Sequence, residues 1–170
     1  MLLALKAENV LEVYAPDRAG TQRFIRSYPV LAASGYLGPK LRMGDQQVPE
    51  GLYRVELLNP NSRFHLSLRL DYPNAFDRRM ARADGRTRLG GDIMIHGNAV
   101  SIGCLAMGDR AAEDLFVLAA DTGIRRIDVV IAPVDLRVRE APSGGSLPAW
   151  VPRLYEQIRG ALEKLPRPAG

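Results

Sequence analysis

The feature of this sequence that most constrains its fold is the strict alternation of apolar and polar residues in two short segments. In the segment YRVEL, Tyr53, Val55 and Leu57 alternate with charged residues. In FHLSLRL, over residues 64–70, aromatic or aliphatic residues take every second position. The positions between them are His65, Ser67 and Arg69. A repeat of two residues is typical of a strand that buries one face and exposes the other. Both segments are therefore predicted to be half-buried strands.

Turn-forming residues separate these segments from further short apolar runs. Clusters rich in Gly, Pro and Asn, such as GYLGPK, GDQQVPEG and NPNS, lie between them. LLALK and VLEVYAP near the start, and IDVVIA at residues 127–132, also have the composition of strands. Short strands in series predict a mainly β fold, with a sandwich or barrel-like sheet.

Helices are expected later in the chain. The segment after Pro73 predicts a short helix capped by Asn74. A second helix is predicted from Asp109, as its N-cap, to a stop at Gly123. Its apolar stripe comprises Ala112, Leu115, Phe116 and Ala119.

The end of the chain predicts a flexible connector and a last helix. Residues 142–147, within PSGGSLP, have the composition of a connector. Residues 148–170 are predicted to form a C-terminal helix that packs on the domain formed by residues 1–141. The apolar stripe of this helix comprises Trp150, Leu154, Ile158, Leu162 and Leu165.

Composition and charge exclude several classes of protein. No stretch approaches the roughly 20 consecutive apolar residues of a transmembrane helix, and Lys6 and Glu8 interrupt the first apolar run too early for a secretory signal. The formal net charge is +4, but no basic recognition helix with interleaved aromatic residues is present, so no nucleic-acid partner is expected. A single cysteine and two histidines exclude an internal disulfide and provide too few ligands for structural zinc. We expect neither a metal nor a cofactor.

The segment IMIHGNAVSIGCLAMGD, residues 93–109, holds the only cysteine, Cys104, and one of the two histidines, His96. A lone cysteine in an apolar context is more often a small buried hydrophobic residue than a reactive one. The alternative is a nucleophile with His96 as its base, because a position shortly before a helix N-terminus favours the thiolate. Gly103 would let a substrate carbonyl approach closely. Spacing and composition leave both interpretations open.

Three motifs in order resemble the L,D-transpeptidase (YkuD-type) catalytic domain family. IMIHGNAVSIGCLAM is similar to its active-site segment, in which a strand ends in His-Gly and a loop returns to a Ser-x-Gly-Cys turn. GDQQVPEGLYRV resembles its Gly-Asp…Pro-x-Gly-x-Tyr segment, and DYPNAFD resembles its Tyr-Pro-Asn segment. The resemblance covers about residues 5–135. It implies the mainly β fold of that domain, with a helix after the cysteine.

The resemblance also implies roles for the residues around the cysteine. Cys104 would be the nucleophile, His96 the general base, and the Gly97 main chain the third member that orients the imidazole. The N–H groups of Gly103 and Cys104 would form an oxyanion hole in a turn fixed by Ser101. The substrate would be a peptidoglycan stem peptide in the periplasm or cell envelope, attacked at the diaminopimelate carbonyl to give a thioester. The residues expected to bind it are Arg86, Arg88, His65 and Asn98.

Two departures from the family pattern bear on the reaction. Ile102 stands where the common turn carries a second histidine, and could contribute only through its main chain. The loop between His96 and Cys104 is also shorter than usual. Both features resemble a subgroup of the superfamily that includes members that hydrolyse the bond between peptidoglycan and an outer-membrane lipoprotein. Transfer to an amine, hydrolysis as an L,D-carboxypeptidase or amidase, and a non-catalytic wall-binding module therefore stay open.

Overall fold

A computed structural model describes residues 1–144 and 147–168. The strands are β1 (Leu2–Leu5), β2 (Val10–Pro16), β3 (Gln22–Pro29), β4 (Ala32–Ala33), β5 (Gly51–Ser62), β6 (His65–Leu70), β7 (Met94–His96), β8 (Leu105–Ala106) and β9 (Asp128–Ala132). The helices are α1 (Ala75–Ala83), α2 (Asp109–Thr122) and α3 (Val151–Leu162), with a 3₁₀ turn at Ile124–Arg126. The prediction of a mainly β fold, with one helix after Cys104 and another near the C-terminus, is confirmed.

The strands form one sheet in the order β3-β2-β1-β9-β5-β6-β7-β8-β4. The long strand β5 joins its two halves, because β5 pairs with β9 through residues 51–54 and with β6 from Val55 onward. Most neighbouring strands are antiparallel, but β1 pairs with β9 and β7 pairs with β8 in parallel. The parallel pair β7–β8 brings together the two ends of the loop between His96 and Cys104.

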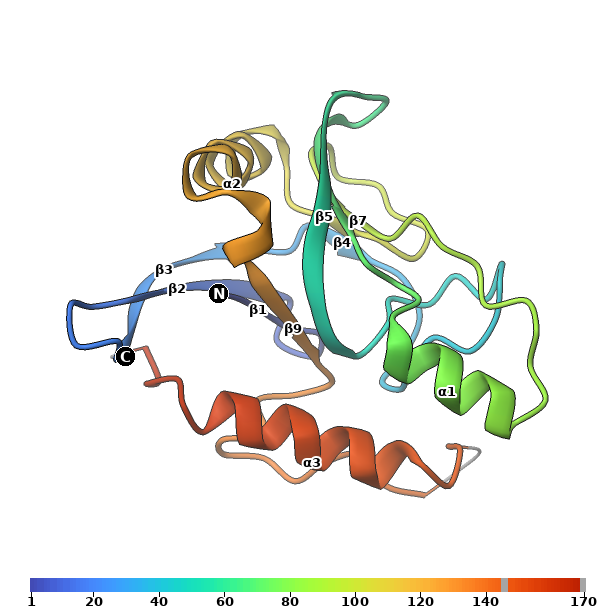
Figure 1. Cartoon of the computed structure of the whole chain (residues 1–170). Coiled ribbons are helices and arrows are strands. Elements are labelled where there is room, and N and C mark those ends of the chain that lie inside the picture. The colour runs from blue at the N-terminus through green and yellow to red at the C-terminus, as the bar shows by residue number, and fades with distance from the viewer. Residues whose placement is uncertain (145–146, 169–170) are drawn as a thin grey trace.

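Helices α2 and α3 cover opposite faces of the part of the sheet formed by β3, β2, β1 and β9 (Figure 1). Side chains alternate along β1, so Leu2 and Ala4 face one core while Leu3 and Leu5 face another. The first core joins α2 to both halves of the sheet, so the sheet bends around it. It includes Ala111, Leu115 and Ala119 of α2 with Leu68, Ile95 and Leu105. The second core is covered by α3 through Val151, Leu154, Tyr155, Ile158 and Leu162.

The two alternating segments differ from the simple pattern at their ends. Leu57 is 41% exposed, because a bulge between Val55 and Leu57 breaks the register of β5 with β6. Phe64 is also exposed, because it lies in the hairpin turn before β6. Ser67, expected on the polar face, is buried opposite His96 of β7. The pairing with β7 places the His96 side chain beside Ser67 on the same face of the sheet, at a position that the pattern alone assigns to solvent.

The helix ends follow their local chemistry. Asn74 caps α1, accepts the N–H groups of Phe76 and Asp77, and completes a capping box with the Asp77 carboxylate. The predicted cap of α2 is wrong by one residue. The N-cap is Gly108, and the carboxylate of Asp109 instead accepts the N–H of Asn98. Gly123 ends the helix with a positive φ of 86°, as expected for a glycine stop.

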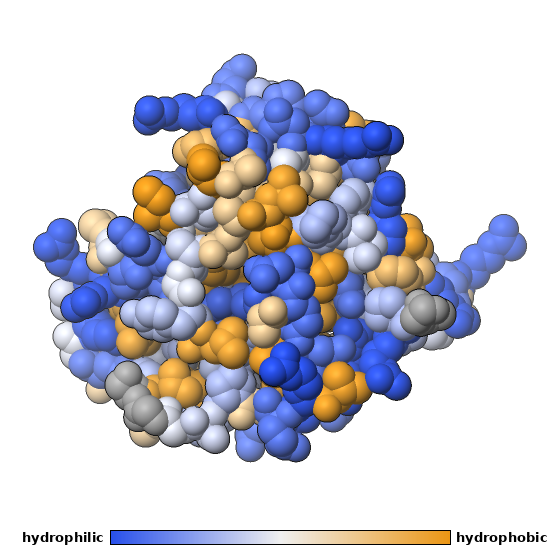
Figure 2. Space-filling view, turned by 180° about the vertical axis from the view of Figure 1, so that it is seen from behind, coloured by the Kyte–Doolittle hydropathy of each residue, from blue (hydrophilic) through white to orange (hydrophobic). Residues whose placement is uncertain are grey.

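The end of the chain runs along the surface of the domain. Of the predicted connector, residues 145–146 lie outside the described residues, and α3 follows them to pack on β9 and β5. Within residues 1–144 and 147–168, no helix is both long and apolar enough to cross a membrane. On the face shown in Figure 2, apolar residues are interspersed with hydrophilic ones.

Candidate active site

His96 and Cys104 are positioned by the adjacent parallel strands β7 and β8. His96 ends β7, and Cys104 immediately precedes β8. The register aligns Ile95 with Leu105, and both of these residues belong to the first core. Because side chains alternate along a strand, His96 and Cys104 project from the opposite face. Continuing the register places Cys104 beside Met94, whose N–H donates to the thiol at 3.3 Å.

The imidazole of His96 is held on two sides. Its Nδ1 lies 2.6 Å from the carbonyl oxygen of Gly97, so Nδ1 carries the proton and Nε2 presents a lone pair. The ring of Phe64 covers the imidazole, with centroids 4.8 Å apart. His96 is only 2% exposed. This burial lowers the pKa of His96 below its usual value, and the hydrogen bond to Gly97 opposes that shift. The side chain is therefore a neutral base near neutral pH.

Close packing explains the glycine after His96. A Cβ at Gly97 would lie 2.6 Å from a carboxylate oxygen of Asp109, 2.8 Å from the Phe64 carbonyl oxygen and 2.9 Å from the His65 Cβ. Real Cβ atoms do not approach other atoms so closely. The position accepts only glycine if the carbonyl that holds His96 is to stay in place.

The thiol of Cys104 is partly buried and neutral. It accepts the Met94 N–H and donates to the Asp92 carbonyl oxygen at 3.6 Å. Burial raises the pKa of the Cys104 thiol; the Met94 N–H and the positive charge of Lys40 oppose this shift, while the charge of Asp92 adds to it. The expectation that the nearby N-terminus of α2 favours the thiolate is therefore wrong. Strand β8 separates the cysteine from that helix, and Met94 is the backbone donor at the sulfur.

Within the described chain, no hydrogen bond joins the thiol of Cys104 to His96, because the thiol points to Asp92. Both groups occupy one face of neighbouring strands, so a rotation about the side-chain bond of Cys104 is the movement that would turn the sulfur toward the imidazole. Such loose contacts are common in the absence of substrate. With a neutral thiol and a neutral imidazole, the arrangement suits a general base that removes the thiol proton as attack begins.

Serine hydroxyls engage both N–H groups expected in the oxyanion hole. The Cys104 N–H donates to Ser101 Oγ at 2.9 Å, and the Ser101 hydroxyl donates back to the Cys104 carbonyl at 2.6 Å. The Gly103 N–H donates to Ser34 Oγ at 2.6 Å. In this structure, both N–H groups that are expected to form the oxyanion hole therefore already have acceptors. Buried N–H groups need acceptors, and these hydroxyls supply them.

The side chain of Ile102 points away from the protein and is 77% exposed. Val100, two residues earlier, is also exposed. The side chain at position 102 therefore contributes little to the packing of the turn. It is free to contact a molecule that binds at the site from solvent.

Two of the residues expected to bind substrate have partners of their own. Arg86 donates to the Asp84 carboxylate at 2.8 Å and to the Leu41 carbonyl at 2.8 Å. Its guanidinium also lies 5.9 Å from the ring centroid of Trp150. The Asn98 side chain accepts the N–H of Ala99 in a turn where Asn98 has a φ of 62°. Both side chains stabilise local structure.

The other two expected binders, His65 and Arg88, are both exposed. His65 has a φ of 71°, and its Nε2 lies 2.8 Å from Glu113 of α2. This contact secures the hairpin turn that carries Phe64. Arg88 is exposed beside Met43, whose N–H donates to the Arg88 carbonyl. Arg88 is thus the predicted binder whose side chain is best placed to meet an anion.

Residues 1–144 and 147–168 contain no group of three or more His, Cys, Asp and Glu side chains that could hold a metal ion.

Two further residues, Phe64 and Ser34, contact this site without a clear signal in the sequence. The alternating pattern predicts that Phe64 lies on the buried face of its strand, and no motif includes Ser34. Ser34 lies 69 residues before its partner Gly103, so no local pattern could connect them. For Phe64, the one signal in the sequence is its position at the end of the apolar face of residues 64–70.

Comparison with known proteins agrees with the resemblance of the motifs. The family model of the YkuD L,D-transpeptidase catalytic domain matches residues 3–131. The Escherichia coli K12 protein YafK is 40% identical over 114 residues, which are 65% of this chain and 43% of YafK. The chain thus spans less than half the length of the curated relatives it matches.

Solved structures share the fold at lower sequence identity. The helical cell shape determining protein Pgp2 from Campylobacter jejuni aligns with a TM-score of 0.63 at 20% identity, over 84% of this chain and 49% of that one. Bd1075 from Bdellovibrio bacteriovorus aligns with a TM-score of 0.56 at 20% identity, over 96% of this chain and 54% of that one. From the match over residues 3–131, the chain belongs to the YkuD family of L,D-transpeptidase catalytic domains.

Proposed function

We propose that this chain is a cysteine acyltransferase that acts on peptidoglycan stem peptides. The observation that carries the proposal is the pair of side chains on one face of β7 and β8. His96 is fixed through Nδ1 by the Gly97 carbonyl, which leaves Nε2 to accept a proton, and Cys104 projects from the neighbouring strand on the same face. Family membership supplies the substrate class.

The first half of the reaction forms a thioester. Nε2 of His96 takes the thiol proton while Cys104 Sγ attacks the carbonyl carbon at the L-centre of diaminopimelate. The resulting oxyanion accepts N–H groups of the turn, in place of or shared with the serine hydroxyls that now accept them. The proton on His96 passes to the leaving amine, which is the terminal D-alanine or another attached residue. The carbon–nitrogen bond breaks and the acyl group stays on the sulfur.

The second half releases the acyl group. An acceptor amine loses a proton to His96 and attacks the thioester carbon, and the carbon–sulfur bond breaks. Cys104 leaves as the thiolate and is reprotonated by His96. If water takes the place of the amine, the product is a shortened or released stem peptide.

The second candidate function is hydrolysis on the same scaffold, as an L,D-carboxypeptidase or as an amidase that releases an outer-membrane lipoprotein. One observation favours it. Ile102, 77% exposed beside the nucleophile, replaces an imidazole of the common family turn with an aliphatic side chain. Without that imidazole, the acceptor side of the thioester has one fewer polar group to bind an amine. Both functions place the protein in the periplasm or cell envelope, where the substrate is.

The deciding experiment is incubation of the protein with purified muropeptides, followed by mass spectrometry of the products. New cross-linked dimers support acyl transfer, and stems that are only shortened or unlinked support hydrolysis. Cys104→Ala should abolish either activity, while Ser27→Ala, on exposed strand β3, should leave it unchanged. If no product forms and Cys104 also resists iodoacetamide in the folded protein, the protein is a non-catalytic wall-binding module and the proposal is wrong.

A further inference from the structure

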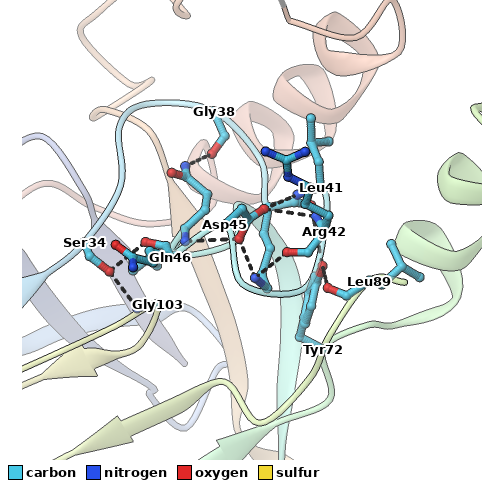
Figure 3. A network of polar contacts seen from close by, with 12 residues as sticks. Ser34, Gly38, Leu41, Arg42, Asp45, Gln46, Tyr72, Leu89 and Gly103 are labelled. Atoms are coloured by element: carbon cyan, nitrogen blue, oxygen red, sulfur yellow. Dashed lines mark hydrogen bonds and ion pairs between the residues drawn. The ribbon is translucent and has the colours of Figure 1, made fainter. Parts of the chain in front are cut away.

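A hydrogen bond ties the turn before the nucleophile to a distant loop. The Gly103 N–H donates to Ser34 Oγ at 2.6 Å, and the Ser34 hydroxyl donates to the Gln46 carbonyl oxygen at 2.7 Å (Figure 3). The hydroxyl therefore accepts one bond and donates another, which fixes its direction. The Gly103 N–H belongs to the peptide between Ile102 and Gly103, one residue before Cys104, so the bond to Ser34 sets the direction of this N–H and restrains the turn that carries the nucleophile.

The loop formed by residues 34–47 is well suited to hold Ser34 still. The carboxylate of Asp45 accepts the N–H groups of Leu41, Arg42 and Gln47 and forms an ion pair with Lys40. The half-buried carboxylate of Asp45 thus links all five residues (Figure 3).

The two ends of the same loop are also joined. The side-chain amide of Gln47 donates to the carbonyls of Tyr36 and Gly38 and accepts the Tyr36 N–H. Gln46, whose carbonyl accepts the Ser34 hydroxyl, has a φ of 55°. A positive φ is uncommon for residues other than glycine and costs free energy that the surrounding structure has to offset. The loop therefore presents the Ser34 hydroxyl in a fixed place.

Glycine is flexible, so the Gly103 peptide needs such an external restraint. Gly103 has a φ of 95° and no side chain to pack, although it is buried. We propose that Ser34 is a positioning residue, which acts through Gly103 to aim its N–H at the oxyanion formed when Cys104 attacks a carbonyl. The N–H can be shared between the hydroxyl and the oxyanion as a three-centre bond. This inference rests on the proposed function of Cys104.

If Ser34 acts in this way, two reactions of the Cys104 thiol should respond differently to its loss. Acylation by a stem peptide passes through an oxyanion and depends on the aim of the Gly103 N–H. Alkylation of Cys104 by iodoacetamide displaces iodide and forms no oxyanion at a carbonyl, so it reports the state of the thiol alone. Ser34→Ala removes the hydroxyl with little change of volume, and Ser34→Thr keeps it.

The test compares both rates in native protein, Ser34→Ala, Ser34→Thr and the surface control Ser27→Ala. We expect Ser34→Ala to lower the single-turnover rate of acylation by muropeptide about tenfold, below the loss for a direct oxyanion donor, with alkylation changed less than about twofold. Ser34→Thr should restore most of the acylation rate, and the melting temperatures of the folded variants should be similar.

Two results would overturn the inference. In one, acylation by Ser34→Ala equals that of native protein. In the other, acylation and alkylation fall in parallel, which indicates that Ser34 serves the thiol or the fold alone. If native Cys104 is alkylated but never acylated, the proposed function fails and this inference fails with it, which distinguishes that case from the other two.

Discussion

The ring of Phe64 lies over the imidazole of His96, with the two centroids 4.8 Å apart and the planes inclined by 31°. Phe64 comes from the β5–β6 hairpin and is itself 41% exposed, so it forms the boundary between the base and solvent. The hairpin is secured by the contact of His65 with Glu113 of α2. A residue outside the catalytic segment thus covers one side of the base.

The first prediction concerns Phe64→Ala. Burial lowers the pKa of His96, so removal of the phenyl ring should raise that pKa toward the usual value of about 6.5. The protonated imidazole cannot accept the thiol proton, so the acidic limb of the pH profile of kcat/KM should move to higher pH. Titration of His96 by NMR checks the shift directly, with His65→Asn used to assign the two histidine signals. An unchanged pKa would show that the phenyl ring does not control water access.

The second prediction concerns Gly97→Ala. The new Cβ would meet Asp109, the Phe64 carbonyl and the His65 Cβ at 2.9 Å or less. Overpacking of this kind costs about 1–3 kcal/mol of folding free energy. Because relief of the clash displaces the carbonyl that holds His96, we expect kcat to fall more than the folded fraction does. Denaturant unfolding and kcat on the same samples check this. Equal losses in both would mean that the carbonyl is not needed to orient the base.

The third prediction concerns Arg86 and Arg88. Arg86 is engaged by Asp84, the Leu41 carbonyl and the ring of Trp150. We therefore expect Arg86→Ala to lower stability by about 1 kcal/mol, through lost hydrogen bonds, with KM for muropeptide unchanged. Arg88→Ala should leave the melting temperature unchanged and raise KM, if this exposed side chain meets a substrate carboxylate. Measurement of Tm and KM for both variants separates them, and the reverse pattern would refute the assignment.

The fourth prediction concerns Ile102→His. The side chain is 77% exposed, so the substitution should change stability by no more than about 0.5 kcal/mol. The new imidazole restores the polar group found in the common family turn, and we expect a larger proportion of cross-linked product relative to hydrolysed product. Mass spectrometry of muropeptide reactions measures that proportion. If it is the same in both proteins, residue 102 does not determine the fate of the thioester.

The fifth prediction concerns the pH dependence of stability. Burial raises the pKa of Asp77 to about 6, above that of an unfolded carboxyl. This group therefore stabilises the fold most at low pH, and its contribution is lost as pH rises from about 4 to above 6. Asp77→Asn, which cannot ionise, should lack this loss. The stability of the variant relative to native protein should thus increase by roughly 2 kcal/mol between pH 4 and pH 7.5 in urea unfolding. No change in that difference would contradict the raised pKa.

Local patterns were sufficient for most of the fold. The alternation in residues 53–57 and 64–70, the Asn74 cap and the Gly123 stop each reflect interactions within a few residues, and the structure contains the elements they predict. The departures occur where a distant segment intervenes. Ser67 is buried where the paired strand β7 places His96 beside it, and Asp109 accepts the N–H of Asn98 while Gly108 is the N-cap of α2.

The active-site segment shows the same division. The sequence by itself determined the family, through three motifs whose order and residue types resemble the catalytic domain, and it placed His96 and Cys104 in one segment. Only the tertiary structure decided the state of the two groups. Burial, to which the ring of Phe64 contributes, keeps the imidazole neutral, and burial keeps the thiol protonated although the Met94 N–H opposes that effect. Ser34 reaches the nucleophile turn across 69 residues. Desolvation and long-range hydrogen bonds depend on which segments pack together, and no local pattern records that.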